Sequence, residues 1–379
     1  MMHLLYIGEA PIQNVRPYRL MQELKGLSME VLYTGTGSAF EERSHEQLTK
    51  AAFDHDLLSG YPSIMAHGQW AIVKAAVNRA DVLVIYGHHQ SLFRKAMWYA
   101  RWKGKKVILT NDATYPEGTA QSSGWKLKLK PLLFRCLYHY LAEAVLVPST
   151  AAALYLRSLG IRIERIVITP YVVDEEFITT ESEHTNREVL REEWKAIPGA
   201  TVFIFCAKWI ERKRPLDVLE AFALARDAHS RLVLIGDGPL KPAILEKIQQ
   251  LGLEESVLLP GLVKYSDLPG YYTSADVLVF SSSHEPYGLP VNEAMLCGIP
   301  VIVSDRIGAR LDLVEQGNTG WVYETGNVNA MAQWMRYAIE HKEEVRQMGK
   351  AAKAKMRAWS SEVNVQRQLD FFKARGWME

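Results

Sequence analysis

The sequence predicts two doubly wound α/β domains that face each other across a central cleft. The chain has 379 residues, and at roughly 100 to 200 residues per domain this length allows two or three. Short runs rich in Val, Ile and Leu alternate with longer amphipathic stretches, as in strand–helix–strand units that form a parallel sheet. A polar, charged segment at 176–200 interrupts this pattern, which then starts again, so we expect one domain on each side of it.

Five candidate strands lie in the first half of the chain. Their apolar residues do not alternate with polar ones, which is typical of strands buried on both faces. The candidates are 3–8 (HLLYIG), 29–35 (MEVLYTG), 81–87 (DVLVIYG), 105–112 (KKVILTND) and 144–149 (AVLVPS). Helical stretches lie between them, for example SLFRKAMWYARWKG, which a glycine ends.

Six candidate strands follow in the second half, and the tail from about residue 330 has a mostly helical composition. The candidates are 201–208, 231–238, 256–261, 276–282, 300–305 and 320–326. The predicted organisation is a first domain at 1–175, a linker at 176–200, a second domain at 201–360 and a C-terminal helix at 361–379. We expect that helix to pack back on the first domain.

Composition excludes several classes of protein. The net charge of +1 gives no overall attraction to nucleic acid. The three cysteines, Cys136, Cys206 and Cys297, lie far apart and match neither a metal site nor a disulfide framework, which fits a reducing compartment. The N-terminus lacks a signal-peptide pattern, and no run approaches the ~18 apolar residues of a membrane-spanning helix. We therefore expect a cytoplasmic protein, either free or lying peripherally on the inner face of the membrane.

Polar and glycine-containing turns follow the candidate strands of the second domain. Lys208 and Lys213 come after the first strand, and Gly236 comes after the second. Open parallel sheets bind ligands at the carboxyl ends of their strands, where these turns would gather. Lysines at such an edge suit the negative charge of a phosphate.

The stretch HEPYGLPVNEAMLCG, after the fourth strand, places two carboxylates close together. Glu285 lies in a loop, Gly288 and Leu289 open a helix, and Glu293 is expected in the first turn of that helix. Free N–H groups at a helix opening attract phosphate, and a carboxylate there can accept hydrogen bonds from a ribose diol. The edge can therefore hold a nucleotide sugar. Asp54 and Asp56 match an Asp-x-Asp metal motif, but they follow no apolar strand and we assign them no metal.

An ordered series of segments resembles a known family. AKWIERKRPLDVLEAF, LVLIGDGP, VLLPGLV, DLPGYYTSADVLVFSS and EPYGLPVNEAMLCGIPVIVSDRIGARLDLVEQGNTGWVY follow one another as they do in the retaining glycosyltransferases of family GT4. The resemblance covers about 144–326. It implies the GT-B fold, in which two Rossmann-like domains face a central cleft and bind acceptor and donor respectively.

The resemblance also implies roles for individual residues. Lys208 and Lys213 would bind the donor diphosphate, Glu293 would hold the ribose hydroxyls, and Glu285 would face the transferred sugar. The donor-binding residues that it implies are Lys208, Lys213, Gly236, Leu262, Val263, Glu285, Gly288, Leu289 and Glu293. The base would lie against Leu262 and Val263, and backbone amides at Gly288 and Leu289 would contact sugar and phosphate.

The first domain departs further from the family. Many members carry a histidine after the strand that matches KKVILTND, where this chain has Asn111 and Asp112. His88 and His89, after DVLVIYG, are the nearest imidazoles. Asp112 and His88 are the candidates here to assist catalysis.

The expected reaction moves a hexosyl group from a nucleoside-diphosphate sugar to a carbohydrate or lipid-linked acceptor with retention of configuration. Lysines and helix-opening amides would stabilise the leaving diphosphate, so we expect no metal and no cofactor. The pathway would be that of a bacterial surface polysaccharide or glycolipid. Two alternatives stay open: an epimerase or hydrolase that acts on the donor alone, and a non-catalytic module that binds nucleotide sugars.

Segment 124–144, GWKLKLKPLLFRCLYHYLAEA, mixes basic and apolar residues. It fits a core-facing helix with a basic outer face. It also fits a peripheral membrane contact, which would suit an enzyme with a lipid-linked acceptor.

Overall fold

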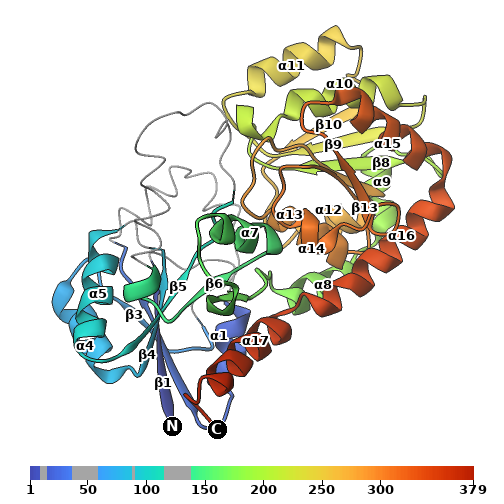
Figure 1. Cartoon of the computed structure of the whole chain (residues 1–379). Coiled ribbons are helices and arrows are strands. Elements are labelled where there is room, and N and C mark those ends of the chain that lie inside the picture. Colours follow the sequence, from blue (N-terminus) through green and yellow to red (C-terminus); the bar gives the residue numbers. More distant parts are fainter. Residues whose placement is uncertain (9–14, 36–58, 88–89, 115–137) are drawn as a thin grey trace, which may run out of the picture. The chain divides into compact units, whose positions relative to one another are not determined.

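The computed structural model describes residues 1–8, 15–35, 59–87, 90–114 and 138–379. The chain divides into two compact units, drawn in Figure 1. The first unit contains the described residues up to Asp174 together with Trp359–Glu379, and the second contains Glu175–Ala358. The chain therefore crosses from one unit to the other and back again.

The described part of the first unit contains a seven-stranded parallel sheet with the order β3-β2-β1-β4-β5-β6-β7. Its strands are β1 (Met2–Gly8), β2 (Leu27–Tyr33), β3 (Ser63–Met65), β4 (Val82–Tyr86), β5 (Lys106–Thr110), β6 (Ala144–Val147) and β7 (Ile166–Ile168). All five strands predicted for this half are present. β3 and β7 were missed because each has only three residues, which is too short for an apolar run to stand out from its neighbours.

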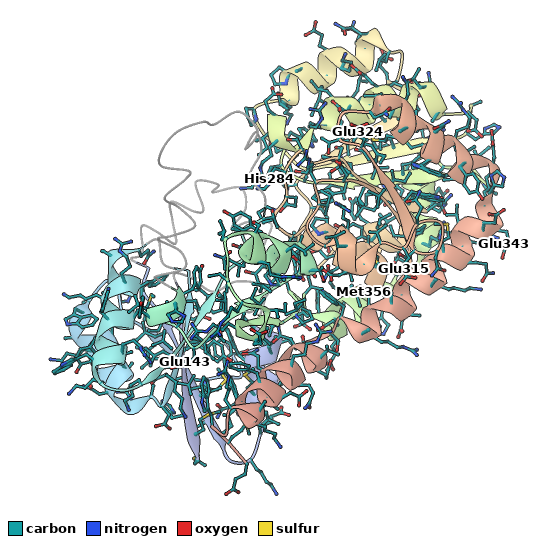
Figure 2. All side chains as sticks on the ribbon, viewed as in Figure 1. Glu143, His284, Glu315, Glu324, Glu343 and Met356 are labelled. Carbon is teal, nitrogen blue, oxygen red and sulfur yellow. The ribbon has the colours of Figure 1, made fainter. Side chains whose placement is uncertain are left out.

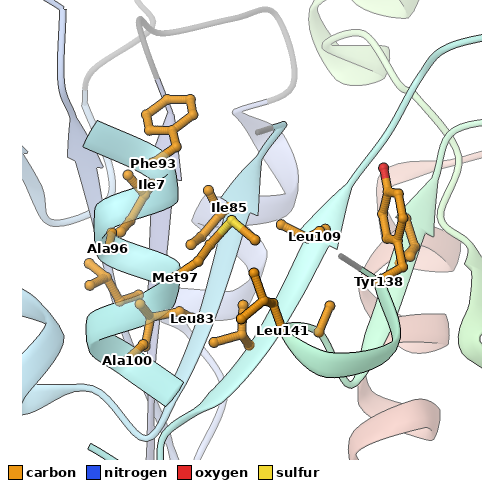
Figure 3. Packing of buried hydrophobic residues seen from close by; sticks show 14 of the residues in the cluster. Ile7, Leu83, Ile85, Phe93, Ala96, Met97, Ala100, Leu109, Tyr138 and Leu141 are labelled. Carbon is orange, nitrogen blue, oxygen red and sulfur yellow. The ribbon is translucent and has the colours of Figure 1, made fainter. Parts of the chain in front are cut away.

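Helices cover both faces of this sheet. They are α1 (Arg16–Gln22), α4 (Trp70–Arg79), α5 (Ser91–Trp102), α7 (Thr150–Ser158), the short η1 (Ile163–Arg165) and α17 (Ser361–Ala374). On one face α5 contributes Phe93 and Met97 to the buried cluster, and Figure 3 shows Met97 beside Ile85 of β4 and Phe93 beside Ile7 of β1. These side chains are fully buried, which explains the continuous apolar runs of the strands.

The C-terminal helix α17 covers part of the other face with α1. Phe372 is fully buried there, and the Tyr6 hydroxyl donates to Gln368 Oε1 at 2.8 Å. Asn364 Nδ2 donates to the Pro170 carbonyl oxygen at 2.7 Å. The last helix of the chain thus completes the core of the first unit.

The second unit contains a six-stranded parallel sheet with the order β10-β9-β8-β11-β12-β13. Its strands are β8 (Val202–Cys206), β9 (Arg231–Ile235), β10 (Val257–Gly261), β11 (Val277–Phe280), β12 (Val301–Ser304) and β13 (Gly320–Tyr323). All six were predicted, and the two sheets confirm the α/β class with two Rossmann-like domains.

The helices of the second unit surround this sheet. They are α8 (Glu175–His184), α9 (Arg187–Glu193), η2 (Glu211–Lys213), α10 (Pro215–Ala225), α11 (Lys241–Gln250), α12 (Leu268–Ser274), α13 (Leu289–Leu296), α14 (Arg310–Leu313), α15 (Val328–Glu340), α16 (Lys342–Lys355) and η3 (Met356–Ala358). Among the residues that the structure describes, none of the helices is long and apolar enough to cross a membrane.

Segment 176–200, which we expected to link the domains, is largely helical. It contains α9 and most of α8, and both helices pack against α12. The buried Arg191 side chain donates to Asp276 Oδ2 at 3.1 Å and to the Ser274 carbonyl oxygen at 3.0 Å. An apolar and ionic attachment therefore holds this segment on the second unit.

Candidate active site

The carboxyl ends of four neighbouring strands carry the residues predicted to bind the donor. Because β8, β9, β10 and β11 are parallel, the loops that follow them begin at the same edge of the sheet. The loop after β8 contains Lys208 and Lys213, Gly236 follows β9, Leu262 follows β10, and Glu285 follows β11.

Gly236 lies where the loops after β8 and β9 approach closely. A Cβ atom there would lie 2.0 Å from the Ala207 carbonyl oxygen, and its φ of 141° is one that other residues rarely adopt. The Trp209 amide donates to the Asp237 carbonyl oxygen at 2.9 Å, which joins the two loops backbone to backbone. The glycine therefore has a structural role here whether or not it contacts a ligand.

Lys213 and Glu285 meet although they are 72 residues apart. Lys213 Nζ forms an ion pair with Glu285 Oε2, and the same Nζ lies 5.0 Å from the centroid of the Phe280 ring. Burial lowers the pKa of the Lys213 ammonium, although the neighbouring Glu285 carboxylate opposes this effect. The Lys213 ammonium is thus a cation partly removed from water, and such a cation suits the recognition of an anion.

Serines after β11 bring this pair together. The Ser281 hydroxyl donates to the Lys213 carbonyl oxygen at 2.8 Å, and the Ser283 amide donates to the Arg212 carbonyl oxygen at 2.8 Å. Arg212 Nη1 lies 3.3 Å from Glu285 Oε2, so a second cation faces this carboxylate. Sequence reasoning did not single out Arg212. Its position next to Lys213 in the same loop was the available signal.

The loop that carries Glu285 is fixed by the segment after β12. The Glu285 amide donates to the Arg306 carbonyl oxygen at 3.1 Å, and the Gly308 amide donates to the Glu285 carbonyl oxygen at 2.9 Å. A Cβ atom at Gly308 would lie 1.9 Å from the Pro286 carbonyl oxygen, so only glycine permits this approach. The position of Glu285 is therefore set by backbone contacts.

Gly288 is the N-cap of α13, and Leu289 is the first helical residue, as the sequence predicted for the start of this helix. Gly288 has a φ of 106°, and a Cβ atom there would lie 2.9 Å from Ile307 Cγ2. α13 thus begins at this same edge of the sheet, next to the Glu285 loop. Its N–H groups carry the partial positive charge that favours phosphate.

Glu293 lies deeper than the sequence suggested. The prediction that it falls in the first turn of its helix was wrong: α13 begins at Leu289, so Glu293 is the fifth residue, in the second turn. Its side chain is buried with 5% exposure, and the Tyr272 hydroxyl of α12 donates to Glu293 Oε2 at 2.9 Å. Burial raises the pKa of this carboxyl to about 7, while the bond from Tyr272 lowers it.

The remaining donor-site candidates are more open. Lys208 is exposed in the loop after β8, and Leu262 and Val263 follow β10 with Leu262 at the surface. They lie on loops at the same edge as Lys213 and Glu285.

In the first unit, Asp112 follows β5 and its side chain is exposed. The neighbouring Asn111 Nδ2 donates to the Tyr138 hydroxyl at 2.7 Å, and Asn111 Oδ1 accepts from the Ala113 amide at 2.8 Å. Several candidates lie outside the described residues: His88, His89, Asp54, Asp56 and positions 124–137 of the basic segment. Within the described ranges, no three His, Cys, Asp or Glu side chains are grouped to hold a metal ion.

Two domains with parallel sheets, the second with candidate donor-binding residues at the carboxyl ends of its strands, are the architecture of GT-B glycosyltransferases. Residues 186–355 match the family described as Glycosyl transferases group 1, and residues 15–177 match Glycosyltransferase Family 4. The chain belongs to the GT4 family of glycosyltransferases.

Two curated relatives illustrate the similarity. The chain is 30% identical over 165 residues to N-acetyl-alpha-D-glucosaminyl L-malate synthase of Bacillus anthracis, which covers 43% of this chain and 42% of that protein. It is 27% identical over 217 residues to alpha-monoglucosyldiacylglycerol synthase of Streptococcus pneumoniae, which covers 56% of this chain and 49% of that protein. The chain thus spans less than half the length of each relative.

A solved structure matches over the whole chain. The structure of Anabaena HepE in complex with UDP has a TM-score of 0.73 and 18% identity, and covers 99% of this chain and 100% of that one. The same protein has also been solved with UDP-glucose, with a TM-score of 0.71. At this identity the match shows the fold.

Proposed function

We propose that the protein transfers a hexosyl group from a nucleoside-diphosphate sugar to a saccharide or lipid-linked acceptor with retention of configuration. The observation that carries the proposal is the Lys213–Glu285 pair, which lies at the carboxyl edge of the second sheet beside the start of α13. A cation, a carboxylate and a helix N-terminus at one edge match the diphosphate and hydroxyl groups of such a donor. HepE, which has the same fold, is described in complexes with UDP and UDP-glucose.

Lys213 and Lys208 would neutralise the donor diphosphate. In the structure, Glu285 balances the charge of the partly buried Lys213 ammonium. A diphosphate would take over that role and free the Glu285 carboxylate for hydroxyls of the transferred sugar. The lysines and the α13 amides would then supply the charge stabilisation for which other transferases use a metal ion.

Glu293 would bind the ribose. Tyr272 holds its Oε2 atom, which leaves Oε1 to accept from a ribose hydroxyl. Gly236, Leu262 and Val263 would line the rest of the nucleotide site, with the base against the last two.

The reaction breaks the bond between the anomeric carbon and the donor phosphate oxygen, which keeps the electron pair. The acceptor oxygen forms the new bond from the same face, and its proton passes to the departing phosphate. Lys208 and Lys213 would stabilise the charge on the nucleoside diphosphate. Asp112 or His88 would assist the deprotonation from the first unit.

The acceptor would belong to a surface polysaccharide or a glycolipid. The names of the relatives support this class, since one of them is a monoglucosyldiacylglycerol synthase. The reaction would take place in the cytoplasm or at the inner face of the membrane.

Replacing Lys213 with alanine tests the donor site directly. We expect Lys213→Ala to lower kcat/KM about 100-fold or more, because one preorganised group that stabilises transition-state charge contributes 10²–10³ in rate. The matched control is Lys247→Ala, since Lys247 of α11 pairs with Glu220 of α10 and its loss should leave the rate unchanged.

Melting curves and turnover assays with a panel of UDP-, GDP-, ADP- and dTDP-sugars would identify the donor base and the reaction type. A ligand at about 100 times its Kd adds ~2.7 kcal/mol to stability, which a melting curve detects. Release of nucleoside diphosphate only when an acceptor is present supports a transferase. Equal turnover of the donor alone would favour the epimerase or hydrolase. A melting shift without turnover would favour the non-catalytic module, and no shift in wild type would contradict the donor site.

A further inference from the structure

Helix α5 of the first unit exposes two tryptophans to solvent. Trp98 is 64% exposed and Trp102 is 75% exposed. Because they are four residues apart, the two indoles lie one turn apart on the same side of the helix. Two neighbouring aromatic side chains of this size form an exposed apolar surface.

The core does not require these tryptophans. α5 already buries Phe93, Ala96, Met97 and Ala100 completely, and Figure 3 shows them among the other residues of the buried cluster. Trp98 and Trp102 belong to the opposite, solvent-facing side of the helix. Exposed apolar faces of this kind mark surfaces that bind another molecule or a membrane.

The charges of the stretch that carries the two tryptophans have one sign. The cations of 91–106 are Arg94, Lys95, Arg101, Lys103, Lys105 and Lys106, and this stretch contains no Asp or Glu. Lys103 Nζ lies 4.6 Å from the centroid of the Trp102 ring. Long cationic side chains beside indoles can keep their stems on apolar surface and their charges in a polar layer.

Neighbouring elements add some negative charge, since Asp81 and Glu379 line one pocket with Lys103, Lys105 and Lys106, where Lys25 adds a further cation. Glu143, labelled in Figure 2, pairs with Arg101 Nη1 at 3.0 Å, so one cation of the face is balanced. The adjacent helix α4 contributes Lys74, which lies 5.7 Å from the Tyr99 ring centroid, and Arg79, which pairs with Glu30. The face around Trp98 and Trp102 therefore stays basic.

We propose that this face of α5 docks on an anionic lipid bilayer. Tryptophan is enriched at the boundary between lipid and water, and basic residues next to it are attracted to anionic headgroups. The charge complementarity favours lipid over a second copy of this chain, because two such faces would repel each other. This surface is different from segment 124–144, and it stands independently of the sugar transfer.

Co-sedimentation of the full chain with vesicles tests the proposal. We expect binding to vesicles of phosphatidylcholine mixed with phosphatidylglycerol, weaker binding at high salt, and little binding to phosphatidylcholine alone. The variant Trp98→Ala/Trp102→Ala should lower the vesicle affinity at least about tenfold, because both apolar anchors are lost. Lys95→Glu/Lys103→Glu should lower it comparably by reversing two charges beside the indoles.

The matched control is Leu224→Ala/Leu245→Ala, which removes two exposed leucines from the second unit and should leave vesicle binding unchanged. All variants should keep the wild-type melting temperature, because every substituted side chain is at the surface. Equal binding by wild type and the tryptophan variant would overturn the proposal, as would equal binding to both vesicle types. A wild-type dimer that the tryptophan variant abolishes, without any vesicle binding, would assign the face to self-association instead.

Discussion

At the residue scale, the two glutamates of EPYGLPVNE have different surroundings. Glu285 faces two cations at the loop edge, where its charge is compensated. Glu293 is buried, and its one described partner is the neutral Tyr272 hydroxyl. The same residue type therefore has two surroundings: Glu285 pairs with cations, whereas burial raises the pKa of Glu293 to about 7.

Glu293 makes stability depend on pH. Its pKa rises from the ordinary 4.5 to about 7 on folding, so the folded state holds the proton more tightly than the unfolded chain. Below pH 4.5 both states are protonated and burial has no charge penalty. The penalty grows as the pH rises toward 7 and is complete above it, at about 3 kcal/mol.

We therefore predict that Glu293→Gln gains stability over wild type as the pH rises. The difference in unfolding free energy should increase by about 3 kcal/mol between pH 4.5 and pH 8. Urea unfolding at both pH values measures it. A difference that stays constant over this range would show that folding does not raise the pKa of Glu293.

At the element scale, the start of α13 depends on one glycine. Gly288 combines a positive φ with a close approach to Ile307, and both follow from the turn that leads out of the Glu285 loop. Glu285 lies in the loop before Gly288, and Glu293 lies in the helix after it. A changed backbone at Gly288 would therefore displace both glutamates. The backbone at Gly288 therefore affects both the stability of the second unit and the geometry of the candidate site.

Gly288→Ala should destabilise the second unit by about 1–3 kcal/mol, because the new Cβ meets Ile307 and the backbone is strained. It should also weaken binding of the donor nucleotide. Gly317→Ala is the matched control: its φ of 73° brings a similar backbone strain, but nothing lies within 4 Å of the new Cβ. If Gly317→Ala matched Gly288→Ala in both measurements, the contact with Ile307 would have no part in the effect.

At the scale of the whole molecule, the chain crosses between the units twice. The last helix leaves the second unit after Ala358 and closes the core of the first around Phe372. One face of the first sheet therefore stays partly uncovered until α17 has been synthesised and packs on it. The stability of the first unit depends on the two ends of the sequence together.

Phe372→Ala should destabilise the first unit by about 3–5 kcal/mol, as expected when a fully buried phenylalanine is truncated. Thermal unfolding should show an earlier transition for the first unit. The control Phe371→Ala changes a less buried neighbour and should have a smaller effect. Equal shifts for both variants would contradict a core role for Phe372.

The sequence by itself determined the α/β class, eleven of the thirteen described strands and the family, since continuous apolar runs and turn residues depend on neighbours a few positions away. It also predicted that the loops gather at one carboxyl edge, because parallel strands all end on the same side. Tertiary structure decided the Lys213–Glu285 pair, the Tyr272–Glu293 bond and the packing of α17 on the first sheet. Each of these joins residues far apart in the chain, and no local pattern records which loops and helices the fold brings into contact.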